Sequence, residues 1–280
     1  MKLQDILGEC GTIQAMDVGA SCIAETPVYK TLLDEGLAHL NAFEGDPRQI
    51  DEIRRFFSGN VSIFNDFLAD GTERTLYVCN KNSGMTSLLK PNERALKFFN
   101  GFDRFGHVIG TEIVKTKRLD DVTGIPKIDF LKMDIQGSEL CVLKNGPNTL
   151  SECMAIQLEV SYICLYEGQP PFGEIDIWMR DNGYVPHCFL DVKRWSISPT
   201  IKNDNFRIPF NQLLESDIVY IKNPMNLDII DNDSLVKMAI ISHYCFSSYD
   251  LCAHIMHELV SRGALGADSI QDYFSIASPQ

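Results

Sequence analysis

The feature that most constrains this chain is the alternation of short apolar runs with segments of helical periodicity along most of its length. Two apolar runs, TIQAMDV and LAHLNAF, flank the segment PVYKTLLDEG, for which Thr26 and Pro27 provide an N-cap and a first-turn proline. The runs IDFLKMD and AIQLEVSY are almost continuously apolar, which is typical of parallel strands that are covered on both faces. The pattern predicts an α/β fold with helices packed on a mostly parallel sheet.

The remaining elements follow from the same periodicities. VSIF predicts a third strand, and the polar stretch after it, with DGTERTLYV and NSGMTSLL, predicts a hairpin or an inserted loop. FGEIDIWMRDNG predicts a helix, while YVPHCFLD and SDIVYIK predict strands separated by a loop rich in proline and asparagine. Helical periodicity resumes after about Pro224. We therefore expect a main domain over residues 1–223 and a helical extension over residues 224–280.

The acidic composition narrows the classes of function. A formal charge of −13 and a pI near 4.9 would repel a phosphate backbone, so we expect no nucleic-acid partner. No apolar run reaches the roughly 18 residues of a membrane span, and MKLQDILGECGT lacks the pattern of a signal peptide, which predicts a cytoplasmic protein with no membrane contact. The nine cysteines are scattered without a CxxC pair, which indicates reduced thiols rather than a zinc site.

The ends of the predicted strands carry the candidate ligand contacts, because ligands of an open parallel sheet bind beyond its carboxyl edge. In DVGAS, Gly19 permits a tight turn, and Asp17 can fix that turn or accept hydrogen bonds from a ligand. Glu44, at the end of the second strand, can accept both hydroxyls of a ribose. Together they favour a ribose-containing cofactor over a plain turn and a solvated carboxylate. Because Ser21 and Ile23 stand where a dinucleotide site would have further glycines, S-adenosylmethionine fits better than a pyrophosphate cofactor.

Several motifs resemble one known family in their order along the chain. KIDFLKMDIQGSELCVLKNG and AIQLEVSYICLYEGQPPFGEIDIWMRDNGY closely resemble the signature half of the FkbM-type S-adenosylmethionine-dependent methyltransferases. KTKRLDDV resembles the strand and turn just upstream, and DVGAS and AFEGDP resemble the cofactor motifs. The resemblance covers about residues 13–222 and is densest over residues 118–184. It implies a class I methyltransferase (Rossmann-like) fold, with a seven-stranded sheet whose last strand, SDIVYIK, is antiparallel.

We expect the cofactor to contact the ends of the first three strands. Near the third strand, Asp66 could accept a hydrogen bond from adenine and Phe67 could offer an apolar face, unless Phe67 belongs to the core. The family usually has asparagine and glycine where this chain has Ser21 and Ile23, so the loop follows another path or cofactor binding is impaired. The predicted cofactor-binding residues are Asp17, Gly19, Ala20, Ser21, Glu44, Asp66 and Phe67.

Three carboxylates are candidates for catalysis: Asp134 closes the fourth strand, Glu139 opens the next helix and Glu159 closes the fifth strand. Methyl transfer requires an acceptor held in line with the methyl group, and a carboxylate can take the proton of an alcohol. The three could instead bind a divalent cation, which their pattern does not favour, or cap helices, the preferred interpretation for Glu139. We assign no metal ligand. Tyr166 and residues 83–89 are candidates for acceptor contacts.

The leading hypothesis is an S-adenosylmethionine-dependent O-methyltransferase that acts on a hydroxyl of a sugar, a glycan or a small natural product. One alternative is a nicotinamide-dependent oxidoreductase. Another is a methyltransferase-like scaffold that has lost its cofactor and docks a partner through the helices between Ser234 and Gly263. The same helices could close over the acceptor or pair two chains as a homodimer.

Overall fold

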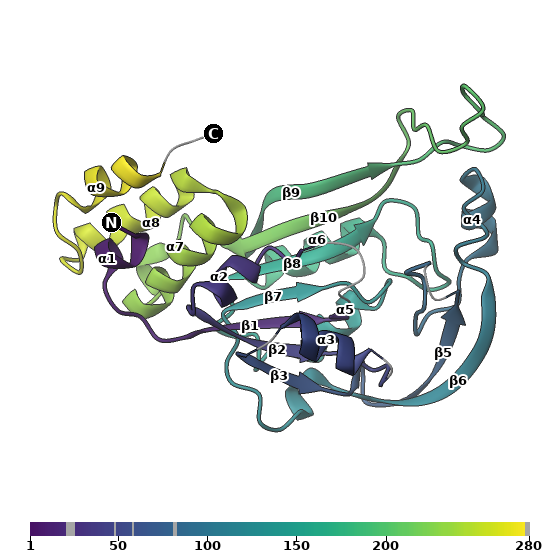
Figure 1. The fold of residues 1–280 in the computed structure, drawn as a ribbon, viewed down its shortest axis with the longest axis horizontal. Helices are drawn as coiled ribbons and strands as arrows, with labels where there is room; N and C mark the ends of the chain where they lie inside the picture. Colours follow the sequence, from purple (N-terminus) through teal and green to yellow (C-terminus); the bar gives the residue numbers. More distant parts are fainter. Residues whose placement is uncertain (21–25, 48, 58, 81–82, 278–280) are drawn as a thin grey trace.

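A computed structural model describes residues 1–20, 26–47, 49–57, 59–80 and 83–277 of the chain, built around one central sheet (Figure 1). Its strands are β1 (Ile13–Val18), β2 (Ala38–Phe43), β3 (Val61–Phe64), β7 (Phe130–Met133), β8 (Ala155–Ser161), β9 (Tyr184–Arg194) and β10 (Leu213–Lys222). The sheet has seven strands in the order β3-β2-β1-β7-β8-β10-β9. Strand β10 runs antiparallel to both of its neighbours, and the other pairs are parallel. The seven-stranded, mostly parallel sheet with an antiparallel last strand is therefore confirmed.

Helices cover both faces of this sheet. One face packs against α2 (Lys30–Asp34), α3 (Ile50–Phe56), α7 (Asn232–Phe246) and α8 (Tyr249–Ser261), and the other packs against α5 (Glu139–Lys144) and α6 (Phe172–Asp181). The short helices α1 (Leu3–Leu7) and α9 (Ser269–Ile276) pack together beside α7 and α8, and 3₁₀ turns η1 (Leu119–Asp121) and η2 (Leu227–Ile229) complete the elements. Along the described ranges, no helix combines the length and apolar character needed to cross a membrane.

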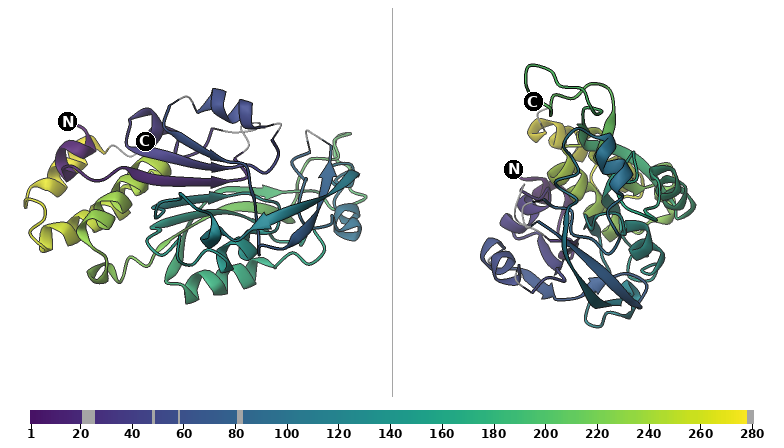
Figure 2. Two further views of the ribbon diagram at one scale, coloured as in Figure 1. Left: turned by 90° about the horizontal axis from the view of Figure 1, so that it is seen from below. Right: turned by 90° about the vertical axis from the view of Figure 1, so that its right-hand side faces the viewer.

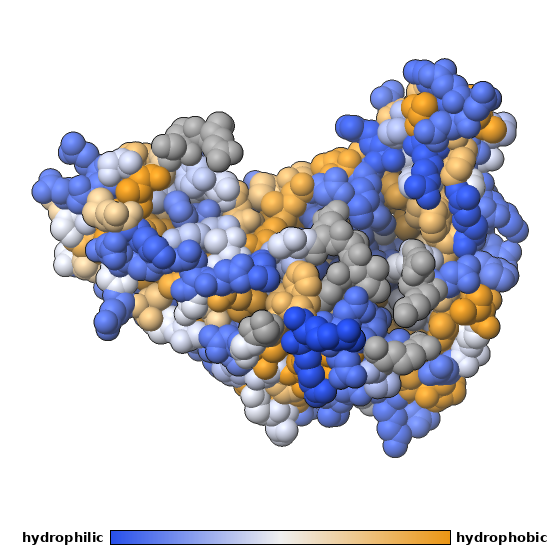
Figure 3. Space-filling view, viewed as in Figure 1, coloured by the Kyte–Doolittle hydropathy of each residue, from blue (hydrophilic) through white to orange (hydrophobic). Residues whose placement is uncertain are grey.

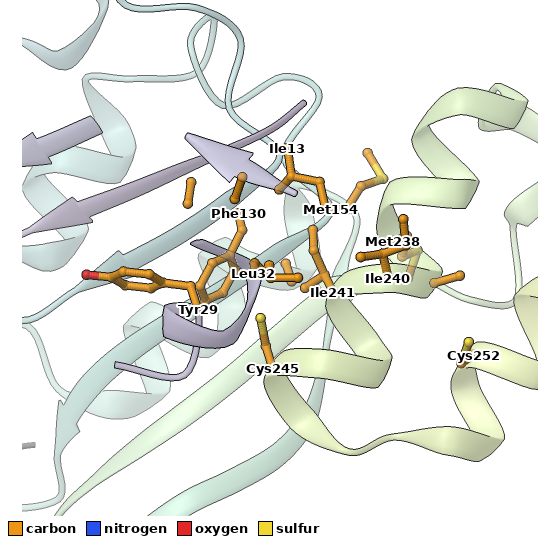
Figure 4. Packing of buried hydrophobic residues seen from close by; sticks show 14 of the residues in the cluster. Ile13, Tyr29, Leu32, Phe130, Met154, Met238, Ile240, Ile241, Cys245 and Cys252 are labelled. Atoms are coloured by element: carbon orange, nitrogen blue, oxygen red, sulfur yellow. The ribbon is translucent and has the colours of Figure 1, made fainter. Parts of the chain in front are cut away.

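The C-terminal helices lie at the amino ends of the parallel strands, opposite the edge where ligands of such sheets bind (Figures 1 and 2). Ile13 and Phe130, near the starts of β1 and β7, share one buried apolar cluster with Ile241 of α7 and Cys252 of α8 (Figure 4). Apolar packing thus continues across the predicted boundary at residue 223. The division into two domains stays a prediction. Within one chain, the C-terminal helices do not lie over the carboxyl edge of the sheet, so they do not close over an acceptor bound there.

A lobe inserted after β3 lies beyond the carboxyl ends of the central strands (Figure 1). It contains α4 (Glu93–Phe98) and a three-stranded sheet, β4-β6-β5, made of β4 (Phe67–Leu68), β5 (Glu73–Cys79) and β6 (Val108–Lys117). Of the two interpretations of DGTERTLYV and NSGMTSLL, the structure has the insertion and not the hairpin, because β5 pairs along its length with β6. The second segment contributes only an isolated bridge between Tyr77 and Ser87.

The start of α2 also differs from the prediction that Thr26 caps it. The helix begins at Lys30, its N-cap is Tyr29, and among the described residues no side chain caps it. Tyr29 is fully buried and its hydroxyl donates a hydrogen bond to Asp17, so tertiary packing rather than local capping sets the start of this helix.

In the space-filling view, a hollow with apolar surface on its floor separates the C-terminal helices from the lobe (Figure 3). The strand β9 forms the edge of the sheet here and exposes Phe189, Leu190 and Val192.

Candidate functional site

The turn after β1 touches the loop after β7, which brings two of the predicted strand ends together. Gly19 has a φ of +82°, and a Cβ added to it would lie 2.1 Å from the backbone oxygen of Asp134. The amide of Asp134 donates to the backbone oxygen of Val18 at 3.0 Å. The amides of Gly19 and Ala20 both donate to the oxygen of Phe43, at 3.0 and 3.2 Å, so they shape the turn rather than present free donors. Ser21 and Ile23 lie outside the described residues.

Asp17 is buried beneath this turn, with 2% of its surface exposed. One carboxylate oxygen accepts a hydrogen bond from the Tyr29 hydroxyl, and the other lies 3.5 Å from Nζ of Lys132. Burial alone would lower the pKa of Lys132, but the carboxylates of Asp17 and then Asp134 raise it above its ordinary value. This geometry favours a role for Asp17 in fixing the turn, with Lys132 as its cationic partner.

Glu44 lies at the end of β2, one strand away from the glycine turn. Its Oε1 accepts a hydrogen bond from the amide of Asp46 at 2.7 Å, and within the described residues its Oε2 has no hydrogen-bond partner. Burial raises the pKa of Glu44 to about 7, and the neighbouring carboxylates Asp46 and Asp17 contribute to the increase. One carboxylate oxygen is therefore free to accept hydrogen bonds from a vicinal diol.

The residues predicted to contact adenine lie next to Glu44. The ring of Phe67 packs on Gly45, where an added Cβ would lie 2.3 Å from a ring carbon. Asp66 forms an ion pair with Lys117 at 2.8 Å and is partly exposed. Phe67 thus presents an apolar surface beside the predicted ribose contact, whereas the Asp66 carboxylate already has a cationic partner.

The side chain of Gln136 joins the carboxylates at the ends of β7 and β8. Its Nε2 donates to Oδ1 of Asp134 at 2.7 Å and to Oε2 of Glu159 at 2.8 Å. Its Oε1 accepts from the Tyr166 hydroxyl at 2.7 Å, and its backbone oxygen accepts from the Ser87 hydroxyl at 2.7 Å. The residue has a φ of +59°, a conformation that non-glycine residues adopt rarely and mostly where the surroundings enforce it. Gln136 therefore fixes the separation and orientation of two predicted catalytic carboxylates.

Glu159 lies among further charged residues from β9 and β10. Burial, followed by the carboxylates of Asp134 and Glu215, holds the pKa of Glu159 well above its ordinary value. Lys193 opposes this effect, because its Nζ lies 3.5 Å from Oε1 of Glu159 and 2.9 Å from Glu215. The buried edge of the sheet thus contains more carboxylates than cations, which favours a cationic ligand and makes Glu159 a stronger base than an exposed glutamate.

Glu139 is nearly fully buried, and its Oε1 accepts hydrogen bonds from the amides of Ile135 and Gly137, both at 3.1 Å. Burial raises its pKa to about 7. These contacts match the capping alternative, in which Glu139 holds the loop that carries Asp134 and Gln136. The geometry does not support the predicted catalytic role of Glu139, because its carboxylate points into the loop.

Within the described ranges, no group of three or more histidine, cysteine, aspartate or glutamate side chains is arranged to hold a metal ion.

The two regions predicted to contact the acceptor do meet at the site. Tyr166 and Ser87, from the 83–89 segment, both contact Gln136.

Sequence reasoning missed Gln136, Lys132 and Lys193. Lys132 offered a signal, because a lysine within the apolar run IDFLKMD has to be paired if the strand is buried. Gln136 offered none, since its role depends on β8 and on Tyr166, both distant along the chain.

The family described as "Methyltransferase FkbM domain" matches residues 17–186, more than half of the chain. A relative, "2-O-methyltransferase NoeI" from Sinorhizobium fredii (strain NBRC 101917 / NGR234), is 43% identical over 65 residues. That match covers 22% of this chain and 27% of the relative, so the chain spans only about a quarter of the relative's length in the aligned part.

Two solved structures show distant likenesses. The precorrin-6y C5,15-methyltransferase of Geobacter metallireducens GS-15 is 13% identical, with a TM-score of 0.38 over 79% of this chain and 85% of that one. A putative methyltransferase from Thermoplasma acidophilum is 11% identical, with a TM-score of 0.34 over 77% of this chain and 70% of that one. The family match, the sheet order and the joined strand ends agree, and the chain belongs to the FkbM methyltransferase family.

Proposed function

We propose that this protein is an S-adenosylmethionine-dependent O-methyltransferase whose acceptor is a hydroxyl of a sugar, a glycan or a related small molecule. The observation that carries the proposal is the contact between the glycine turn after β1 and the loop of Asp134, whose carboxylate Gln136 ties to Glu159. This contact puts the predicted cofactor turn and the predicted proton acceptors side by side at one edge of the sheet.

The residues present fit the cofactor. Glu44 keeps one carboxylate oxygen free for the ribose hydroxyls, and Phe67 offers an apolar surface beside it. The excess of carboxylates near Asp134 and Glu159 favours the positive sulfonium electrostatically. When bound, S-adenosylmethionine supplies an electrophilic methyl group. The residues of the chain itself hold the acceptor and take up its proton.

The chemistry expected of these residues is positioning and proton removal. An acceptor hydroxyl must be held in line with the methyl group, and its proton must leave during or after attack. Asp134 can accept that proton, because it is partly exposed and lies against the glycine turn. Gln136 keeps Glu159 within reach of the same hydrogen-bond network, where the raised pKa of Glu159 makes it a stronger proton acceptor than an exposed glutamate.

Two observations support a hydroxyl acceptor: the name of one relative and the position of the inserted lobe. The matched relative from Sinorhizobium fredii is named a 2-O-methyltransferase, which favours a hydroxyl over an amine or a carbon acceptor. The inserted lobe contributes Ser87 to the network around Gln136, and loops above the strand ends commonly set specificity.

The test is methyl transfer from isotopically labelled S-adenosylmethionine to a panel of neutral mono- and oligosaccharides, with products identified by mass spectrometry. An O-methylated sugar formed by the wild type and lost in Asp134→Asn is the expected result. If the protein binds the cofactor but transfers label only to amine or carbon acceptors, the O-methyltransferase proposal is wrong. If it binds no cofactor at all, the scaffold alternative replaces it.

A further inference from the structure

The inserted lobe contains a cavity of about 480 Å³ that lies outside the site proposed for methyl transfer. Its walls come from three elements of the lobe: Tyr77 of β5, Leu96 of α4 and Thr111 of β6 all line it. In Figure 1 these elements lie together beyond the carboxyl ends of the central strands. The volume falls within the range of roughly 300–1,000 Å³ that is usual for small-molecule sites.

The cavity combines an apolar base with polar sides. Leu96 and Pro91 are buried, and an added Cβ on Gly106 would lie 2.2 Å from Cδ1 of Leu96, so the turn before β6 lies directly on α4. Tyr77 contributes an aromatic side chain, and Thr111 contributes an exposed hydroxyl. Such a lining suits a ligand that has both C–H surfaces and hydroxyl groups.

The charges around the cavity argue against an anionic ligand. Lys90 is paired with Glu167 at 2.9 Å, and Lys97 is paired with Glu93 at 3.3 Å, so both lysines have carboxylate partners. In contrast, Asp103 also lines the cavity and forms no ion pair or side-chain hydrogen bond with any described residue.

His107, which also lines the cavity, is likewise without a hydrogen-bond or ion-pair partner in the described part of the chain. A free carboxylate and a free imidazole can accept or donate hydrogen bonds to neutral hydroxyl groups. A phosphate or sulfate would instead favour unpaired lysine or arginine side chains, and both lysines that line this cavity are paired.

Two short chains of contacts connect the cavity wall to Gln136. The backbone of Tyr77 exchanges both hydrogen bonds with Ser87, at 2.8 and 3.2 Å, and the Ser87 hydroxyl donates to the backbone oxygen of Gln136. Pro91, another wall residue, pairs with Tyr166, whose hydroxyl donates to Oε1 of Gln136. The cavity is thus one layer of residues away from the loop that carries Asp134.

We propose that this cavity is a subsite for a neutral saccharide unit of the acceptor, distinct from the unit that is methylated. The inference rests on the proposed O-methyltransferase function for the identity of the acceptor, but the subsite can be tested by binding alone. Asp103 and His107 bond hydroxyl groups of the sugar, and the base formed by Leu96 and Pro91 contacts its C–H surface.

The experiment measures binding of neutral gluco-, manno- and N-acetylglucosamine oligosaccharides of one to four units to the full chain, without cofactor. Thr111→Trp fills the cavity and Asp103→Ala removes the free carboxylate. Thr123→Trp and Asp121→Ala are matched controls, because Thr123 and Asp121 are exposed and do not line the cavity. We expect the wild type and both controls to bind at least one oligosaccharide, and each cavity variant to bind it at least about tenfold more weakly.

Calorimetry with S-adenosylmethionine on the same samples reports the cofactor site separately, and we expect the cavity variants to match the wild type there. The subsite is refuted if no neutral oligosaccharide binds the wild type. It is equally refuted if the cavity variants bind the oligosaccharide as tightly as the wild type does. The same holds if the two control variants lose as much affinity as the cavity variants. A wild type that binds oligosaccharide but no cofactor would keep the subsite and remove the methyltransferase.

Discussion

The two ends of the central sheet are built from the same strands but differ in chemistry. On the face that packs against α7, each of three neighbouring strands changes from apolar to polar side chains toward its carboxyl end. The series are Ile13, Ala15 and Asp17 in β1; Phe130 and Lys132 in β7, followed directly by Asp134; and Ala155, Gln157 and Glu159 in β8. The amino ends therefore join the apolar cluster of the C-terminal helices, and the carboxyl ends form the candidate site.

The residues that stabilise the fold and the residues of the candidate site therefore lie only a few positions apart in each strand. Burial of apolar side chains at the amino ends stabilises the fold. Buried carboxylates at the carboxyl ends oppose folding unless they are paired or protonated, which is a cost that proteins accept mainly at functional sites. We therefore expect substitutions at the carboxyl ends to change activity while the protein stays folded. Substitutions at the amino ends should lower stability while the activity per folded molecule stays the same.

The largest expected effect is on the chemical step at the carboxyl end. Asp134→Asn keeps the shape of the side chain but removes the proton acceptor, so kcat for methyl transfer should fall by about 10²–10⁴. The free energy of unfolding should change little, because Asp134 is only partly buried. Steady-state kinetics and chemical denaturation measure the two quantities. Asp121→Asn, at an exposed position, is the control and should leave both unchanged.

At the amino end, Ile241→Ala should act on stability alone. Ile241 is 1% exposed within the apolar cluster, and its truncation should lower the free energy of unfolding by about 2–5 kcal/mol. The activity per folded molecule should remain that of the wild type. Ile177→Ala is the matched control, since Ile177 on α6 is 62% exposed. A loss of kcat in Ile241→Ala under conditions where it is folded would show that the two ends are not separate.

Substituting Gln136 sharpens the comparison within the carboxyl end. Gln136→Leu removes both hydrogen bonds to the carboxylates, each of which is worth about 1.5–3 kcal/mol when an ionised group accepts it, so kcat should fall about 10–100-fold. Without this donor, the ionised form of Glu159 is less stable and the pKa of Glu159 rises further. The acid limb of the pH–rate profile should therefore move to higher pH. An unmoved limb would mean that Gln136 has only a structural role.

The smallest expected effect is a change in how stability depends on pH. Glu139 has a pKa of about 7 in the folded chain, above its ordinary value of 4.5, so the folded state binds more protons than the unfolded state between these pH values. The free energy of unfolding should therefore decrease as pH rises from 5 to 7, by on the order of 1–2 kcal/mol from this group.

Glu139→Gln keeps the oxygen that accepts from Ile135 and Gly137 but cannot ionise. Its unfolding free energy should lose this part of the pH dependence and exceed that of the wild type above pH 7. Chemical denaturation at a series of pH values measures both. An identical slope in the two proteins would contradict the burial of an ionisable carboxylate at this position.

Much of the fold could be predicted from the sequence because its central strands are buried on both faces. The runs that became β7 and β8 are nearly continuous in apolar residues, those that became β1 and β2 are rich in them, and the helices after residue 223 have clear periodicity. The pairing of β5 with β6 could not be predicted, since it joins segments separated by α4. The start of α2 was also missed, because it depends on the burial of Tyr29 and not on a local cap.

The site was predictable where a residue's position in a strand sets its role. Asp134 directly follows β7 and Glu159 lies near the end of the adjacent β8, so their proximity follows from the sheet. The difference between Glu139, which holds its own loop, and Glu159, which faces Gln136, depends on side-chain direction and could not be read from sequence.

We propose that the carboxyl ends of β1, β2 and β7 form one cofactor pocket in which Glu44 binds the ribose. Calorimetric titration of the wild type and of Glu44→Ala with S-adenosylmethionine tests it most directly. We predict micromolar affinity in the wild type and a loss of at least about tenfold in the variant, the equivalent of roughly one charge-assisted hydrogen bond. Millimolar or absent binding in the wild type, or equal affinity in the two proteins, would contradict the claim.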